Sequence, residues 1–78
     1  MKRTIENTVK VKDHFNGKLK TIDLVHVNDP DCTWFNSTIY YEVEVTEKKK
    51  SVYCSAQQNR KAASDHIKML IEMYLLIG

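Results

Sequence analysis

Hydrophobic and polar residues alternate with a period of two over residues 37–46, a pattern typical of a β-strand with one buried face. Similar alternation over residues 4–14, 19–28 and 51–54 predicts three more strands. The hydrophobic side chains of the most regular stretch are Ile39, Tyr41, Val43 and Val45. The chain therefore predicts a sheet that is covered on one side.

The turn signals between these stretches predict two hairpins. Asn16-Gly17 favours a type I′ turn, because both central positions of that turn need positive φ. A two-residue turn there pairs Val11 with Ile22 and Lys10 with Asp23, so that apolar pairs share one face. The polar residues 47–50 predict the loop of the second hairpin.

A helix is predicted after the fourth strand. Ser55 and Gln58 have the spacing of a capping box, and no proline or glycine interrupts residues 56–76. The last strand would place Val52 and Cys54 on the core face, opposite Val45 and Val43. We therefore expect a single domain over residues 1–78. Its fold class is α+β, a four-stranded antiparallel sheet of two hairpins packed by one long C-terminal helix, in the order ββββα.

The second half of this helix is hydrophobic on more than one face. One stripe faces the sheet, and a second stripe beside it consists of Met69, Met73 and Leu76, with His66 at its margin. Leaving such side chains in water forgoes several kcal/mol in a small domain. Either a curved sheet or the loop that holds Trp34 covers the second stripe, or it packs against a second copy of the chain or into a groove on another protein. We expect self-association through this stripe, most simply as a homodimer.

The loop between the second and third strands contains Trp34 and Phe35. Exposed aromatic residues often anchor a binding partner. The alternative is that they plug the open end of a small core. We take Trp34 and Phe35 as candidate partner-binding residues.

Charge is unevenly distributed along the chain. Residues 1–20 carry six basic and two acidic residues, residues 21–47 carry six acidic residues and no basic one, and residues 48–78 carry six basic and two acidic residues. Neighbouring strands can neutralise one another, or the basic residues can form a surface for RNA or another single-stranded nucleic acid. The candidates for that surface are Lys10, Lys12, Lys18, Lys20, Lys48, Lys49 and Lys50, with Tyr40 and Tyr53 as stacking residues.

No motif for catalysis, a metal or a cofactor stands out. Cys32 and Cys54 are too few for a disulfide framework, and Cys54 is expected to be a buried, inert thiol. No secretory signal or membrane-spanning segment is expected, which indicates the cytoplasm. The sequence therefore favours a non-enzymatic protein that binds or inhibits another macromolecule, with nucleic-acid binding as the alternative. High lysine, asparagine and isoleucine content suggests an AT-rich genome and a phage accessory protein.

Overall fold

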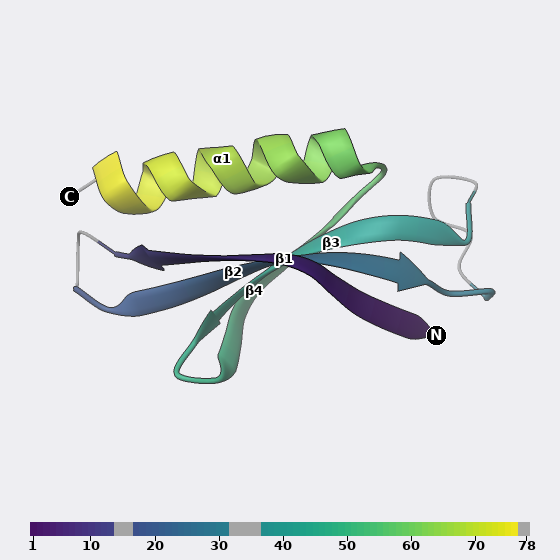
Figure 1. The fold of residues 1–78 in the computed structure, drawn as a ribbon, viewed down its shortest axis with the longest axis horizontal. Coiled ribbons are helices and arrows are strands. Elements are labelled where there is room, and N and C mark those ends of the chain that lie inside the picture. The colour runs from purple at the N-terminus through teal and green to yellow at the C-terminus, as the bar shows by residue number, and fades with distance from the viewer. Residues whose placement is uncertain (14–16, 32–36, 77–78) are drawn as a thin grey trace.

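The computed structural model describes the backbone of residues 1–13, 17–31 and 37–76, with side chains as far as Tyr74. Four strands form one antiparallel sheet in the order β1-β2-β3-β4. The elements are β1 (Lys2–Lys12), β2 (Leu19–Asn28), β3 (Ile39–Glu47), β4 (Lys50–Gln57) and α1 (Arg60–Leu76). The predicted ββββα order and α+β class are confirmed, with a single helix lying along one side of the sheet (Figure 1).

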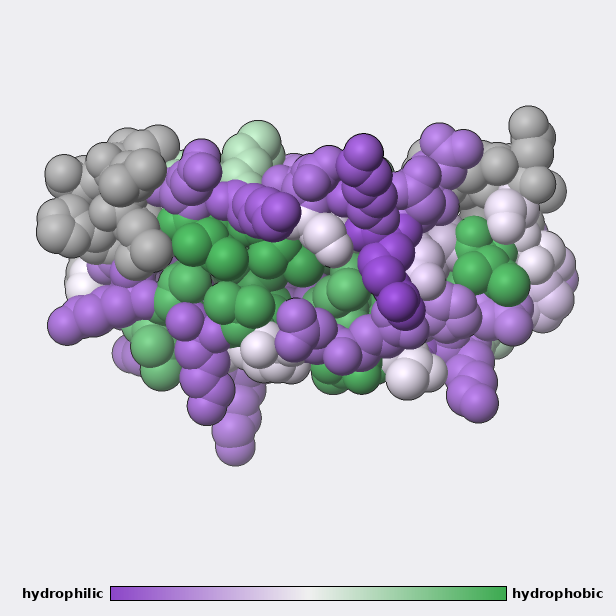
Figure 2. Space-filling model, turned by 45° about the horizontal axis from the view of Figure 1, so that its top comes forward, coloured by the Kyte–Doolittle hydropathy of each residue, from purple (hydrophilic) through white to green (hydrophobic). Residues whose placement is uncertain are grey.

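The main core lies between α1 and the sheet. Ala63, Ile67 and Leu70 of the helix pack against alternate residues of three strands. The strand residues in this cluster are Val11, Ile22, Leu24, Val43 and Val45. Figure 2 shows a hydrophobic area at the surface, bordered by hydrophilic residues. The period-two pattern therefore assigned the covered face correctly.

A second buried cluster occupies the face of the sheet that points away from α1. Val25, Val27 and Tyr40 are at most 6% exposed there. Arg3 on β1 and Glu42 on β3 lie on either side of β2, and the Arg3 Nε donates a hydrogen bond of 2.9 Å to Glu42. This ion pair spans β2 on the face that helix α1 leaves open.

The register predicted for the first hairpin is wrong by two residues. Val9, not Val11, pairs with Ile22. The Asp13 N–H donates to the Lys18 carbonyl at 2.8 Å, so the connection contains four residues rather than two. Gly17 has a φ of 72°, as a tight turn requires, whereas Asn16 lies outside the described residues. This shift is even over residues 7–12, so it keeps their side chains on the predicted face, which explains why this part of the core was assigned correctly.

The second hairpin is tighter than predicted. Glu47 pairs with Lys50, and Lys48 and Lys49 between them have φ of 53° and 66°, as in a type I′ turn. The strand then bulges at Val52. As a result Tyr53 and Ser55, rather than Val52 and Cys54, lie opposite Val45 and Val43.

The predicted start of the helix is also wrong. Ser55 belongs to β4, which extends to Gln57. Asn59 is the N-cap, because its Oδ1 accepts a hydrogen bond of 2.8 Å from the Ala62 N–H. Ser55 and Asn59 both have side chains able to cap a helix, so the capping-box spacing alone could not identify Asn59 as the cap.

Candidate functional site

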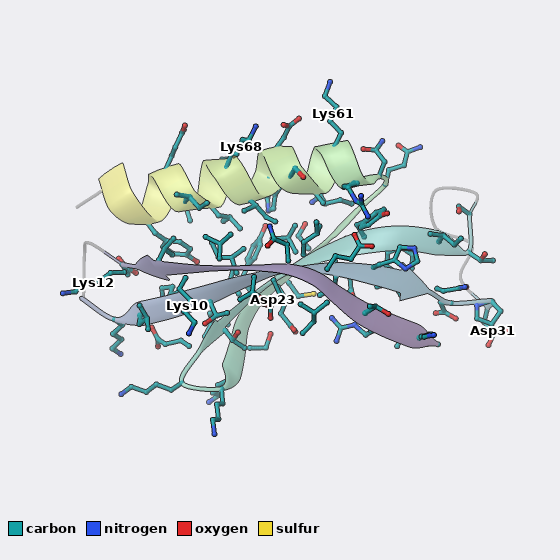
Figure 3. The ribbon with its side chains drawn as sticks, viewed as in Figure 1. Lys10, Lys12, Asp23, Asp31, Lys61 and Lys68 are labelled. Atoms are coloured by element: carbon teal, nitrogen blue, oxygen red, sulfur yellow. The ribbon has the colours of Figure 1, made fainter. Side chains whose placement is uncertain are left out.

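Most of the candidate lysines gather at one end of the sheet, which we call the lysine end. Antiparallel strands in consecutive order bring the β1–β2 and β3–β4 turns to the same end. The exposed lysines there are Lys10, Lys12, Lys18, Lys48, Lys49 and Lys50. Figure 3 shows Lys10 and Lys12 toward this end and Asp31 at the opposite end.

Between the two hairpin tips lies a groove of about 520 Å³. The first hairpin lines it with Gly17, Lys18, Leu19 and Thr21, and the second with Glu47, Lys48 and Lys49. Lys10 and Lys12 lie beside this groove, opposite Thr21 and Leu19 on β2. Strand pairing therefore continues the basic surface from the groove onto β1.

Glu47 is neutralised by lysines. Its Oε1 accepts a hydrogen bond of 2.8 Å from the Lys20 Nζ, and its other oxygen lies 3.8 Å from the Lys18 Nζ. The hydrogen bond from Lys20 lowers the pKa of Glu47 and raises the pKa of Lys20. This carboxylate therefore stays ionised and leaves the groove a net positive charge.

Two of the predicted nucleic-acid residues are not available at the surface. Lys20 pairs with Val11 on the helix side of the sheet and is only 8% exposed. Its Nζ lies 5.4 Å from the centre of the Tyr74 ring. Tyr40 is 6% exposed in the second cluster, so it offers no face for stacking. Alternation turns Lys20 toward α1, whereas Tyr40 lies on the opposite face of the sheet and is buried there beside Val25 and Val27.

A second candidate surface, the β4–α1 surface, consists of Tyr53, His66, Met69 and Met73. The Tyr53 hydroxyl and the His66 Nε2 are 2.7 Å apart, and their rings stack with centres 5.7 Å apart. Met69 and Met73 follow His66 by three and seven residues, so they share its flank of the helix. They are 52% and 40% exposed. The predicted stripe is therefore exposed at both described methionines, and it continues onto β4.

The prediction that Cys54 is buried is wrong. Cys54 is exposed on the face away from α1, because the bulge at Val52 reverses the facing of the following residues. Its Sγ lies 3.4 Å from an oxygen of Glu42. Partial desolvation and the carboxylates of Glu42 and Glu44 raise the pKa of Cys54 to about 11. The thiol is therefore protonated at neutral pH, which makes it a poor nucleophile.

Some predicted residues lie outside the described part of the chain. Trp34 and Phe35 belong to residues 32–36, which the structure does not describe. The described side chains end at Tyr74, so the side chain of Leu76 also lies outside them. The sequence did not predict the groove or the contact between Tyr53 and His66. The groove depends on the tight turn at Lys48–Lys49, for which neither residue is a usual signal. The contact between Tyr53 and His66 depends on the bulge at Val52.

Within residues 1–13, 17–31 and 37–76, no three His, Cys, Asp or Glu side chains are arranged to hold a metal ion. No helix in these ranges is long and apolar enough to cross a membrane. Comparisons of the chain with protein-family models, with curated proteins and with solved structures found no match. The lysine end and the β4–α1 surface are therefore the two candidate sites of function.

Proposed function

We propose that this protein is a small non-enzymatic interaction module that forms a homodimer through β4 and the β4–α1 surface. The carrying observation is a difference between the two edges of the sheet. A strand edge presents unpaired N–H and C=O groups, and proteins commonly protect it with charged residues and bulges. The β1 edge has both charged residues and a bulge, whereas the β4 edge has a bulge but almost no charged residues.

The β1 edge carries charges along its whole length and bulges at Glu6. Its charged residues are Lys2, Arg3, Glu6, Lys10 and Lys12. β4 carries none from Ser51 to Gln57, and after its bulge at Val52 the residues 53–57 are regularly paired with β3. Antiparallel pairing of residues 53–57 with a second copy brings no like charges opposite one another.

The same arrangement brings the β4–α1 surfaces of the two copies together. A two-fold axis perpendicular to the sheet keeps both helices on one face, with Met69 and Met73 of each copy flanking the new strand pair. Burying the exposed half of these four side chains contributes about 3–6 kcal/mol. Association costs about 4–15 kcal/mol, so pairing between the β4 strands must contribute as well.

Light scattering during size exclusion tests the proposal, with an expected mass of twice the 9.1 kDa of one chain. Met73→Lys and Tyr53→Lys each place a charge in the contact and are expected to yield monomer. Ile5→Lys, at a residue 61% exposed on β1, adds the same charge at the other edge and should leave the dimer intact. A native monomer at every concentration, or a dimer that persists in Met73→Lys, contradicts the proposal.

We place the module in the cytoplasm. The free, exposed thiol of Cys54 supports a reducing compartment.

A second candidate function is the binding of RNA or another single-stranded nucleic acid. It is favoured by a separate observation, the gathering of six exposed lysines at the lysine end. Retention of a labelled oligouridine at low salt, and its release as salt increases, tests this function.

A further inference from the structure

We infer that the groove between the two hairpin tips is the site that holds the phosphate backbone of a single-stranded nucleic acid. The inference rests on the second candidate function and assigns it to particular residues. It concerns Lys48 and Lys49 at one wall of the groove, and Lys10 and Lys12, which continue it along β1.

The conformation of the second hairpin tip supports this site. Lys48 and Lys49 both have positive φ, in a turn that favours asparagine and glycine. Two lysines in this turn lower its stability, because both have a Cβ at positive φ, and they place two ammonium groups beside the groove. Departures from local preference are expected where a residue serves function rather than folding.

The charge of the groove supports the same site. Glu47 is the acidic residue among the described groove residues, and the Lys20 Nζ at 2.8 Å neutralises it. Lys20 is buried, and the second Glu47 oxygen lies 3.8 Å from the Lys18 Nζ, so these ion pairs do not use Lys49 or the lysines of β1. The charges of Lys48 and Lys49 therefore attract anions without opposition from Glu47.

The arrangement of the lysines indicates which kind of anion the groove binds. Lys10 and Lys12 point to the same face of β1, roughly 6.6 Å apart along the strand. They form a row with the groove rather than a closed pocket, which suits a linear polyanion. Lysine binds phosphate as a point charge, whereas reading of base edges favours arginine. Leu19, 60% exposed in the groove, offers an apolar contact to a sugar or base.

The test measures binding of a fluorescently labelled oligouridine by anisotropy at several salt concentrations. Four phosphate contacts predict a slope of log K against log salt of about −2.8, at 0.7 per contact for a single strand. Lys48→Asn/Lys49→Gly removes two contacts but retains a favourable turn. We expect the slope to fall to about −1.4 and the affinity at 0.1 M salt to fall about 25-fold.

Lys61→Gln/Lys68→Gln is the matched control, because it removes the same charge from the outer side of α1 (Figure 3). Thermal melting of each variant checks that it is folded. A loss of affinity and slope in the tip variant alone supports the inference. Equal losses in both variants indicate attraction by net charge and overturn it.

The remaining outcomes separate the site from the function. Binding by the native protein that the tip variant retains in full overturns the groove but leaves the second candidate function standing. No binding of oligouridine at low salt overturns both. Equally tight binding of oligoglutamate identifies an acidic protein as the partner and overturns the assignment to nucleic acid.

Discussion

Replacing the tip of the second hairpin should make the protein more stable. Lys48 and Lys49 occupy the left-handed region, at φ of 53° and 66°. An L-residue with a Cβ is disfavoured there by roughly 1–2 kcal/mol, whereas glycine has no such penalty and asparagine tolerates the region. Lys48→Asn/Lys49→Gly gives this turn the residues that a type I′ turn favours.

The expected gain is smaller than the sum of the two penalties. Glycine costs about 0.5–1 kcal/mol through the greater freedom of the unfolded chain, and asparagine removes only part of the penalty at the first position. A net gain of about 1–2 kcal/mol remains. For a domain of this size, each kcal/mol corresponds to a rise in melting temperature of about 4–8 °C.

Urea unfolding followed by circular dichroism measures this gain as a shift in midpoint at constant slope. Lys48→Gln/Lys49→Gln is the control, because it removes both charges and keeps a Cβ at both positions. The difference between the two variants isolates the backbone contribution from charge repulsion. If the Asn-Gly variant is no more stable than the Gln-Gln variant, the turn is not strained and the reasoning fails.

Three further predictions follow from single contacts. Asn59→Ala should lower the free energy of unfolding by about 1 kcal/mol, whereas Ser55→Ala should change it by less than about 0.5 kcal/mol, as measured by urea midpoints. A larger effect of Ser55→Ala would show that Ser55, not Asn59, caps the helix. Alkylation of Cys54 by iodoacetamide should be slow at pH 7 and accelerate up to its pKa of about 11, and rapid reaction at neutral pH would refute the raised pKa. The pKa of Glu47 is lower in the folded protein than in the unfolded chain, so its ion pair stabilises the fold above the unfolded-state pKa of about 4.3. This stabilisation is lost as the pH falls through the pKa of the folded state. Glu47→Gln should therefore be less stable than the native protein at pH 7 and should match it in acid.

The fold was predictable because its strongest determinant is a period of two. Alternation set the inward face of β3 and hence the partners of α1, including Val43 and Val45. A register error of two residues in the first hairpin did not alter this result, because even shifts preserve facing. Errors of one residue did alter it. The bulge at Val52 exposed Cys54 and turned Tyr53 toward His66.

The site was less predictable than the fold. Six of the seven candidate lysines do gather, but Lys20 is turned into the core by its pairing with Val11. The groove exists because two residues with no turn propensity form the tightest turn in the described chain. Local sequence signals do not encode such a turn. It follows from pairing across the whole of β3 and β4.

The two proposals concern different groups, so each can be false without the other. Antiparallel pairing of β4 with its copy, centred on Ser55, separates the two Lys50 residues by roughly 33 Å and points the two lysine ends in opposite directions. A single-stranded oligonucleotide must be long enough to span that distance before it can contact both lysine ends. A dimer would therefore bind long oligonucleotides more tightly than short ones through avidity, beyond the gain from additional overlapping sites. A monomer has one lysine end and gains no avidity with length, so the length dependence of affinity reports on assembly, and the salt dependence reports on the groove.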